Sequence, residues 1–484
     1  MRLPFGFAKR NGVLISPDTE TVLFKDGLSP NVYAEVQRFV GKHLEFRLVD
    51  GSTFDKQLSL SYQSDSDEAM QMIEDLGEDL DLGTIMDALP ETGDLLEYND
   101  DAPIIKLINS VLSEAVKVGA SDVHVETYEM RLVIRFRVDG VLREVVSPRR
   151  ALAPLIVSRI KVMAKLDIAE KRLPQDGRIS VLVGGKEVDV RVSTIPASKG
   201  ERVVMRLLDK QEGRRDLSRL GMSESDMEVM IALVHRPHGI ILVTGPTGSG
   251  KSTTLYACLD QLNDRSRNIL TVEDPIEYDV EGIGQTQVNT RANMTFAKGL
   301  RAILRQDPDV VMVGEIRDTE TADISVQASL TGHLVLSTVH TNTAIGALTR
   351  LANMGVQPYL LSNSIIGVLA QRLVRVVCAD CRESYKADSY ECEFLKVKKR
   401  PRPEIFRAKG CEKCAYEGYR GRIGIYEVVQ IDEDIRRMIH SGVSELDIEA
   451  HARAQSSGIR DDGRQKVLAG LTTIDEVLRQ TMDD

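Results

Sequence analysis

Residues 240–253, IILVTGPTGSGKST, decide the fold of this chain, because an apolar run leads through a glycine-rich loop into a lysine and two hydroxyl residues. The spacing of Gly245, Gly250, Lys251 and Ser252 is that of a P-loop. Its glycines let backbone N–H groups close on phosphate oxygens at the start of the following helix. We expect Lys251 to reach the β- and γ-phosphates and the Ser252 hydroxyl to ligate Mg²⁺. The residues predicted to bind the nucleotide are Gly245, Pro246, Thr247, Gly248, Ser249, Gly250, Lys251, Ser252 and Thr253.

Length and composition limit the class of protein. A chain of 484 residues is too long for one hydrophobic core, and roughly three domains are expected. The formal net charge of −11 argues against a non-specific nucleic-acid binder, which is normally basic. No stretch approaches the roughly 18 apolar residues of a transmembrane helix, and the N-terminal MRLPFGFAKR lacks the apolar core of a signal peptide. We therefore expect a cytoplasmic protein with no nucleic-acid partner.

The sequence before the P-loop divides into three segments. Residues 1–62 mix short β-prone runs with an amphipathic helix after Ser29-Pro30, which predicts a small α+β module. Residues 63–100 contain no lysine or arginine and many acids, which predicts a mobile linker with short helices. Residues 101–208 predict a second α+β domain.

Turn signals and arginines characterise residues 101–208. Pro103 suits the start of an amphipathic helix that Gly119 closes, and Asp139-Gly140 predicts a β-hairpin. The later strands carry Arg178, Arg191, Arg202 and Arg206. Strand arginines usually face solvent, but some of these could instead reach a phosphate bound by a neighbouring subunit, as arginine fingers do.

The remaining chain carries the nucleotide site. Residues 209–222 are polar and predict a hinge, and from residue 223 strands alternate with helices, which indicates an α/β core with a largely parallel sheet. Glu273 and Glu315 each follow an apolar strand. Ligands bind beyond the carboxyl ends of such strands, so these carboxylates could hold Mg²⁺ or polarise the attacking water. Helix caps or loop acids are the alternative.

His333 and His340 flank the apolar strand 334–336. A lone histidine is more often structural, but His340 follows a strand that should also end near the γ-phosphate. A structural role and a hydrogen-bonding sensor role both remain open for it.

Four of the six cysteines form two CxxC pairs, which are Cys378 with Cys381 and Cys411 with Cys414. Four thiolates suit a tetrahedral Zn²⁺ without an open position, so the metal would be structural; reduced free thiols are the alternative. The expected module spans residues 374–418. Residues 430–484 predict a C-terminal helical region.

Several motifs occur here in one order: SDVHVE, RLPQDGRIS, the P-loop, TVEDPIE, RQDPDVVMVGEIRD, TGHLVLSTVHTN and the paired CxxC. Together they resemble the secretion ATPases of type II secretion and type IV pilus systems across residues 101–484. The resemblance implies a RecA-like ATPase domain at 223–484 with an inserted tetracysteine zinc module, a preceding PAS-like domain and a small N-terminal α+β module. It also implies a homo-hexamer that hydrolyses ATP to move an inner-membrane platform protein.

The resemblance also implies residue roles. Lys251 and Ser252 would hold phosphates and Mg²⁺, Glu315 would be the Walker B acid, and Glu273 the Asp-box acid. Which of these two acids activates water is left open by the resemblance. His340 would contact the nucleotide region. Arg178 and Arg191 would act across a subunit boundary.

The branch within the family is a finer question. The single short N-terminal module, opening with LPFGFAKRNGVLI, resembles that of the type II secretion member, which docks on the cytoplasmic domain of a bitopic inner-membrane protein. We expect type II secretion through pseudopilus assembly, with residues 1–90 as the docking surface. A type IV pilus assembly ATPase is the alternative.

Two other classes of protein fit the residues less well. A nucleotide-gated scaffold that scarcely turns over would not need acids beside the γ-phosphate, so Glu273 and Glu315 argue against it. A DNA-translocating relative is disfavoured by the net charge and by the lack of a basic channel segment with interleaved aromatic residues.

Overall fold

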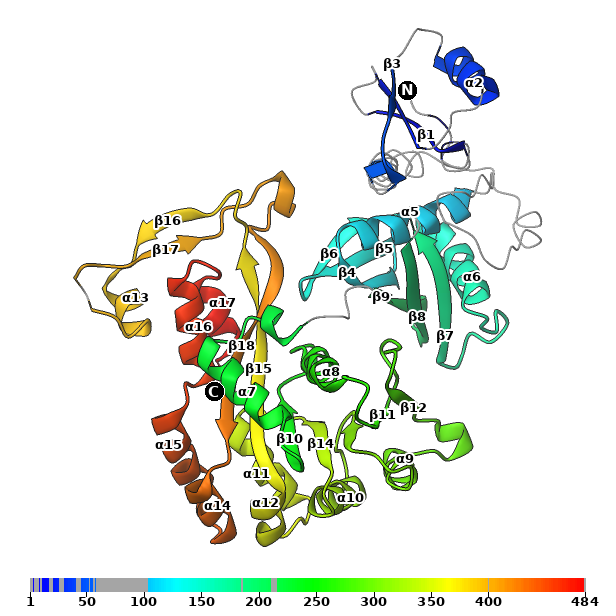
Figure 1. The fold of residues 1–484 in the computed structure, drawn as a ribbon. Coiled ribbons are helices and arrows are strands. Elements are labelled where there is room, and N and C mark those ends of the chain that lie inside the picture. Colours follow the sequence, from blue (N-terminus) through cyan, green and yellow to red (C-terminus); the bar gives the residue numbers. More distant parts are fainter. Residues whose placement is uncertain are drawn as a thin grey trace. The chain divides into compact units, whose positions relative to one another are not determined.

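The computed structural model describes residues 103–482 except 184–185, 210–215 and 399, together with residues 3, 8, 11–16, 21–25, 30–40, 45–51, 53–54 and 57 (Figure 1). The chain forms two compact units, Met1–Lys210 and Gln211–Asp484. The predicted acidic linker at 63–100, with its short helices, lies outside the described residues, as does the centre of the predicted hinge.

A small three-stranded sheet forms the beginning of the first unit. Strand β2 pairs antiparallel with β1 and parallel with β3, and the helix predicted after Ser29-Pro30 begins at Pro30. Val36 of this helix is buried, whereas Tyr33 and Phe39 are exposed. The elements are β1 (Val13–Ile15), β2 (Thr21–Phe24), α2 (Pro30–Val40) and β3 (Glu45–Leu48).

The rest of the first unit is a six-stranded sheet in the order β6-β5-β4-β9-β8-β7, with antiparallel neighbours throughout. The predicted hairpin turn is present, and both Asp139 and Gly140 have positive φ, as a tight turn between twisted strands requires. Alternate strand residues such as Val123 and Val125 share a core with helix residues Leu112 and Ile156, so both helices cover one face. The elements are α5 (Pro103–Lys117), β4 (Ala120–Thr127), β5 (Leu132–Val138), β6 (Val141–Val146), η1 (Arg150–Leu152), α6 (Ala153–Met163), β7 (Gln175–Val183), β8 (Lys186–Ala197) and β9 (Gly200–Asp209).

The second unit contains a seven-stranded sheet in the order β12-β11-β13-β14-β10-β15-β18. All of its neighbouring strands are parallel except β15 and β18, so the predicted parallel α/β core is confirmed. The strands are β10 (Gly239–Thr244), β11 (Ile269–Glu273), β12 (Gly284–Gln287), β13 (Val310–Val313), β14 (Leu334–Val339), β15 (Ile365–Val377) and β18 (Tyr419–Gln430).

Both faces of this sheet are covered by helices. Along β10, Ile240 and Leu242 pack into one core, whereas Ile241 and Val243 pack into another. The strand before the P-loop is therefore a continuous apolar run because both of its faces are buried. The helices between strands are η2 (Leu217–Arg219), α7 (Glu224–Val234), α8 (Lys251–Leu262), η3 (Thr290–Ala292), α9 (Phe296–Ile303), α10 (Thr319–Leu330), α11 (Ala344–Asn353) and α12 (Pro358–Ser364).

Strands β15 and β18 form a long antiparallel pair, and residues 378–418 form an excursion between them (Figure 1). The excursion holds β16 (Glu383–Lys386), α13 (Ser389–Phe394), β17 (Glu404–Arg407) and η4 (Glu412–Cys414). The chain then continues as α14 (Glu433–His440), α15 (Glu445–Gln455), α16 (Ile459–Leu468) and α17 (Ile474–Gln480). Within the described part of the chain, we find no helix whose length and apolarity would let it cross a membrane.

Candidate functional site

The P-loop follows β10 directly and ends at the first residue of α8. Gly250, the N-terminal cap of that helix, has a φ of 89°, which L side chains rarely adopt. At Gly245 an added Cβ would lie 2.4 Å from the carbonyl oxygen of Gln371. The loop therefore needs glycine at these positions for backbone conformation and for close packing against β15. Pro246, Thr247 and Gly248 form its exposed crest, and Ser252 is exposed at the start of α8.

Lys251 is buried and turned toward the loop. Its Nζ donates to the carbonyl oxygens of Gly245 and Pro246 at 2.8 and 3.0 Å. Burial, with a smaller contribution from the charge of Arg372, lowers the pKa of Lys251 to about 8 against the opposing effect of Glu315. In the empty site burial therefore destabilises the charged form of Lys251, and a bound anion would stabilise it.

The parallel strands β10, β14 and β13 are neighbours in the sheet. Lys251, His340 and Glu315 follow these strands, so they lie at the carboxyl ends of the strands. His340 Nε2 lies 3.6 Å from Oε2 of Glu315, whose other oxygen pairs with Arg317. The Glu315 side chain is only 12% exposed, and its Oε2 has no hydrogen-bond partner among the described residues. Burial and the nearby charge of Lys251 lower the pKa of His340. His340 is therefore mainly neutral at neutral pH and can donate or accept a hydrogen bond.

Glu273 lies at the end of β11, the strand beyond β13, and is held by protein donors on both carboxylate oxygens. Oε1 accepts from Thr271 Oγ1 at 2.5 Å and from Gln285 Nε2 at 3.1 Å. Oε2 accepts from the hydroxyl of Tyr256, which lies on α8. Burial and the carboxylate of Glu273 together raise the pKa of Tyr256. Glu273 is thus part of a buried network that joins β11 and β12 to the P-loop helix.

Sequence analysis did not identify Thr244, Gln371 and Arg372, whose side chains hold the loop and its surroundings in place. Thr244 Oγ1 donates to the carbonyl of Thr341 at 2.9 Å and accepts from its N–H at 3.0 Å, which joins the end of β10 to the turn after β14. The buried Arg372 donates from Nη2 to the carbonyl of Asn342 at 2.8 Å, and Gln371 contacts the loop itself. Gln371 and Arg372 interrupt the apolar strand β15, and Thr244 is the last residue of β10. The sequence gives no other indication of their role.

The arginines predicted to act across a subunit boundary lie in the first unit. Arg178, Arg191 and Arg206 are directly paired across β7, β8 and β9, so they form a row on the sheet face opposite the core. Arg206 Nε pairs with Asp122 Oδ1 at 2.9 Å, and Arg202 pairs with Glu126. The role of Arg178 and Arg191 toward a phosphate stays a prediction.

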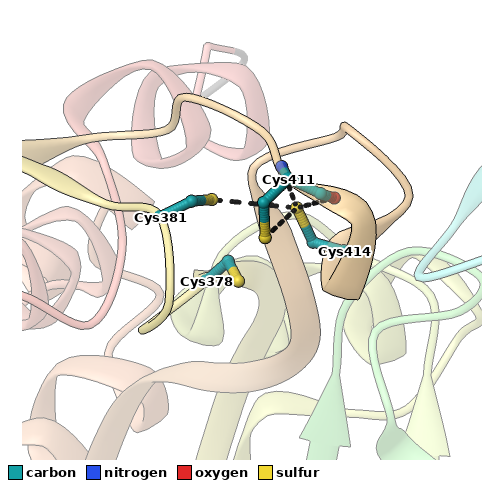
Figure 2. Close-up of side chains that lie close together, drawn as sticks. All are labelled: Cys378, Cys381, Cys411 and Cys414. Atoms are coloured by element: carbon teal, nitrogen blue, oxygen red, sulfur yellow. Dashed lines mark hydrogen bonds between the residues drawn. The ribbon is translucent and has the colours of Figure 1, made fainter.

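The four cysteines of the two CxxC pairs converge between the ends of β15 and β18 (Figure 2). Their sulfur atoms lie within 4.8 Å of one another, and Cys414 Sγ lies 3.8 Å from both Cys381 Sγ and Cys411 Sγ. A tetrahedral ion with bonds of about 2.3 Å separates its ligands by roughly 3.8 Å, so the spacing fits Zn²⁺.

Backbone N–H groups support a thiolate at Cys414. Cys411 N and Gly418 N each donate to its sulfur at 3.2 Å. Although burial opposes the charged form, these donors and the thiols of Cys411 and Cys381 lower the pKa of Cys414 to about 7, whereas burial raises the pKa of Cys381. The cluster is therefore able to bind a metal ion. Cys258 and Cys392 are buried outside it.

Family models match nearly the whole chain. One described as Type II/IV secretion system protein matches residues 97–479, and one for an N-terminal domain of GSPII protein E matches residues 2–62. Type II secretion system protein E of Pseudomonas aeruginosa is 62% identical over 485 residues, covering 100% of this chain and 97% of that protein. Type II secretion system ATPase E of Vibrio cholerae is 58% identical over 489 residues, with the same coverage.

Solved structures share the fold. The ATPase DotB of Legionella pneumophila has a TM-score of 0.59 at 19% identity, covering 82% of this chain and 99% of that one. The pilus retraction motor PilT, solved with bound ADP, has a TM-score of 0.53 at 25% identity, covering 77% of this chain and 96% of that one.

Proposed function

The chain belongs to the type II/IV secretion system protein family and is a P-loop ATPase, and we propose that it works as a hexamer that powers protein export by type II secretion. In this proposal it assembles a pseudopilus at the inner membrane through a platform protein. The full-length similarity to type II secretion proteins E and the match of residues 2–62 to the N-terminal domain model favour this branch over type IV pilus assembly.

One observation carries the enzymatic part of the proposal: Lys251, Glu315 and His340 converge at the carboxyl ends of three adjacent parallel strands. Bound ATP would bring Mg²⁺, which supplies charge neutralisation on the phosphates. The Ser252 hydroxyl would ligate that ion at the start of α8. The Lys251 ammonium would leave the loop carbonyls for the phosphate oxygens, and Glu315, with one oxygen lacking a hydrogen-bond donor among the described residues, would orient and polarise the attacking water.

The remaining site residues have supporting roles. His340, mainly neutral at pH 7, would hydrogen-bond near the γ-phosphate. Glu273 would act as the second acid, which requires that one oxygen leave its present donors. Arg178 and Arg191 would neutralise phosphate charge on the neighbouring subunit. We also propose that the cysteine cluster holds structural Zn²⁺, which would connect the end of β15 to the start of β18.

The domain organisation is proposed with the same boundaries as predicted above. These are a docking module at 1–62, a linker at 63–100, a PAS-like domain at 101–208, a hinge at 209–222 and a RecA-like domain at 223–484. Residues 1–90 would bind the cytoplasmic domain of a bitopic inner-membrane protein. The protein would then act on the cytoplasmic side, recruited to the membrane through its partners.

Substitution of Glu315 by Gln tests the enzymatic proposal. We expect turnover to fall by at least about a hundredfold while the dissociation constant for ATP changes little, because the loop and Lys251 remain. Asp323→Asn, an exposed carboxylate on α10, is the control and should leave both values unchanged. A wild-type chain that binds ATP without measurable turnover would favour the scaffold instead, and unchanged turnover in Glu315→Gln would remove this residue from the mechanism.

A further inference from the structure

Gln371 is a buried polar residue on a strand that is held on both sides. In β15, its neighbour Ala370 is paired with Thr244 of β10, and Gln371 itself is paired with Tyr426 of β18. The residue is only 1% exposed. Its backbone is therefore fixed by the sheet, whereas the glycine-rich loop that it faces has much more conformational freedom.

The side-chain amide of Gln371 contacts the loop and its helix through both of its polar atoms. Nε2 donates to the carbonyl oxygen of Ser249 at 2.6 Å, and Oε1 accepts from Thr254 Oγ1 at 2.7 Å. A carbonyl oxygen can only accept, so the Ser249 partner fixes which amide atom is the nitrogen. One rigid side chain thus connects the last turn of the loop to the first turn of α8.

Close packing adds to these hydrogen bonds. A Cβ on Gly250 would lie 3.0 Å from Nε2 of Gln371, and one on Gly245 would lie 2.4 Å from its carbonyl oxygen. Both ends of the loop therefore rest against this residue. Because the peptide unit is planar and trans, a Ser249 carbonyl that points to Gln371 makes the N–H of Gly250 point to the opposite side.

We propose that Gln371 is a positioning residue for the nucleotide: it holds the Ser249–Gly250 peptide so that its N–H faces the phosphates. The inference rests on the proposed nucleotide function of the loop. The loop's conformational freedom is restricted before binding, so less order has to be gained when the nucleotide arrives. Gln371 acts through the loop backbone, whereas Glu315 and His340, the groups assigned to the attacking water and the γ-phosphate, follow β13 and β14. Its loss should therefore weaken binding more than the chemical step.

The test compares Gln371→Met with Thr254→Val in the full-length protein. Methionine has a similar length but no donor, so it loses both contacts, whereas Thr254→Val loses only the contact to Oε1. The dissociation constant for a fluorescent ADP analogue, together with KM and kcat for ATP and the apo melting temperature, is measured for each. We expect Gln371→Met to raise the dissociation constant and KM about tenfold or more, with kcat within about threefold of wild type. Thr254→Val should keep the dissociation constant, KM and kcat within about threefold of wild type.

Several outcomes would overturn the inference. These are a folded Gln371→Met that binds the analogue like wild type, a loss confined to kcat, or an equal loss in Thr254→Val, which would indicate general packing of α8. If Gln371→Met does not fold, Gln371→Asn serves in its place; its amide is one methylene too short to reach both partners, and the same loss of affinity is expected. A wild-type protein that fails to bind the analogue would instead contradict the proposed function.

Discussion

The hydroxyl of Tyr256 donates to Oε2 of Glu273, and this contact joins the middle of the P-loop helix to the end of β11. The acid is thereby bound to the same helix that begins with Lys251. Tyr256 also stacks on Tyr278, with ring centroids 4.3 Å apart, so the donor itself is fixed. Because both oxygens of Glu273 accept hydrogen bonds from protein donors, this carboxylate stabilises the apo fold. It would have to give up a donor in order to act in catalysis.

Tyr256→Phe should therefore destabilise the apo protein. Hydrogen bonds to buried charged groups contribute about 1.5–3 kcal/mol, so the unfolding midpoint should fall measurably in thermal denaturation. Tyr359→Phe, at an exposed tyrosine on α12, is the matched control and should leave the midpoint unchanged. Equal midpoints for Tyr256→Phe and wild type would mean that the network does not hold Glu273 in solution.

Lys251 should take up a proton when nucleotide binds at alkaline pH. Its pKa of about 8 in the empty site means that a large part of the population is neutral at pH 8.5, and phosphate favours the charged form. Binding should therefore be accompanied by uptake of roughly 0.7 proton at pH 8.5 and almost none at pH 7. Calorimetry of ADP binding in buffers with different ionisation enthalpies measures this. Equal proton uptake at the two pH values would contradict the lowered pKa.

The sign of the stability effect follows from the same shift. The folded-state pKa of Lys251 lies below its unfolded value, so below pH 8 the folded apo protein carries the full cost of a buried cation. That cost is relieved as pH rises from about 8 toward 10.5.

Because Glu315 raises this pKa, Glu315→Gln should move the onset of proton uptake to lower pH. An onset that stayed unchanged or moved upward would contradict the interaction between Glu315 and Lys251.

The cysteine cluster should hold about one zinc ion per chain. Cys414→Ser removes the sulfur that receives two backbone N–H donors, and the purified variant should lose most of its metal and unfold at lower temperature. Cys392→Ser, a buried cysteine outside the cluster, is the control that should keep its zinc. Elemental analysis of both proteins measures the metal content directly. Full metal content in Cys414→Ser would exclude this site.

The features that could be predicted from the sequence are those set by local spacing and strand order. The P-loop is contiguous, and Glu315 and His340 each follow a strand whose end meets the loop in a parallel sheet. The partners of Glu273 and the role of Gln371 could not be predicted, because both depend on side-chain packing that local spacing does not reveal. Even the separation of 17 residues between Tyr256 and Glu273 gives no indication that the two side chains meet. Gln371 lies 122 residues from Ser249, and polar residues inside an apolar strand give no indication of what they face.

The measurement that tests the account most directly is ATP hydrolysis per subunit over a wide range of protein concentration, with native mass spectrometry alongside. A site completed by Arg178 and Arg191 of a neighbouring subunit predicts low specific activity in the monomer and a steep rise as hexamers form. Constant specific activity from a chain that stays monomeric would contradict this. The site would then be self-contained, and the proposed ring mechanism with its shared arginines would be wrong.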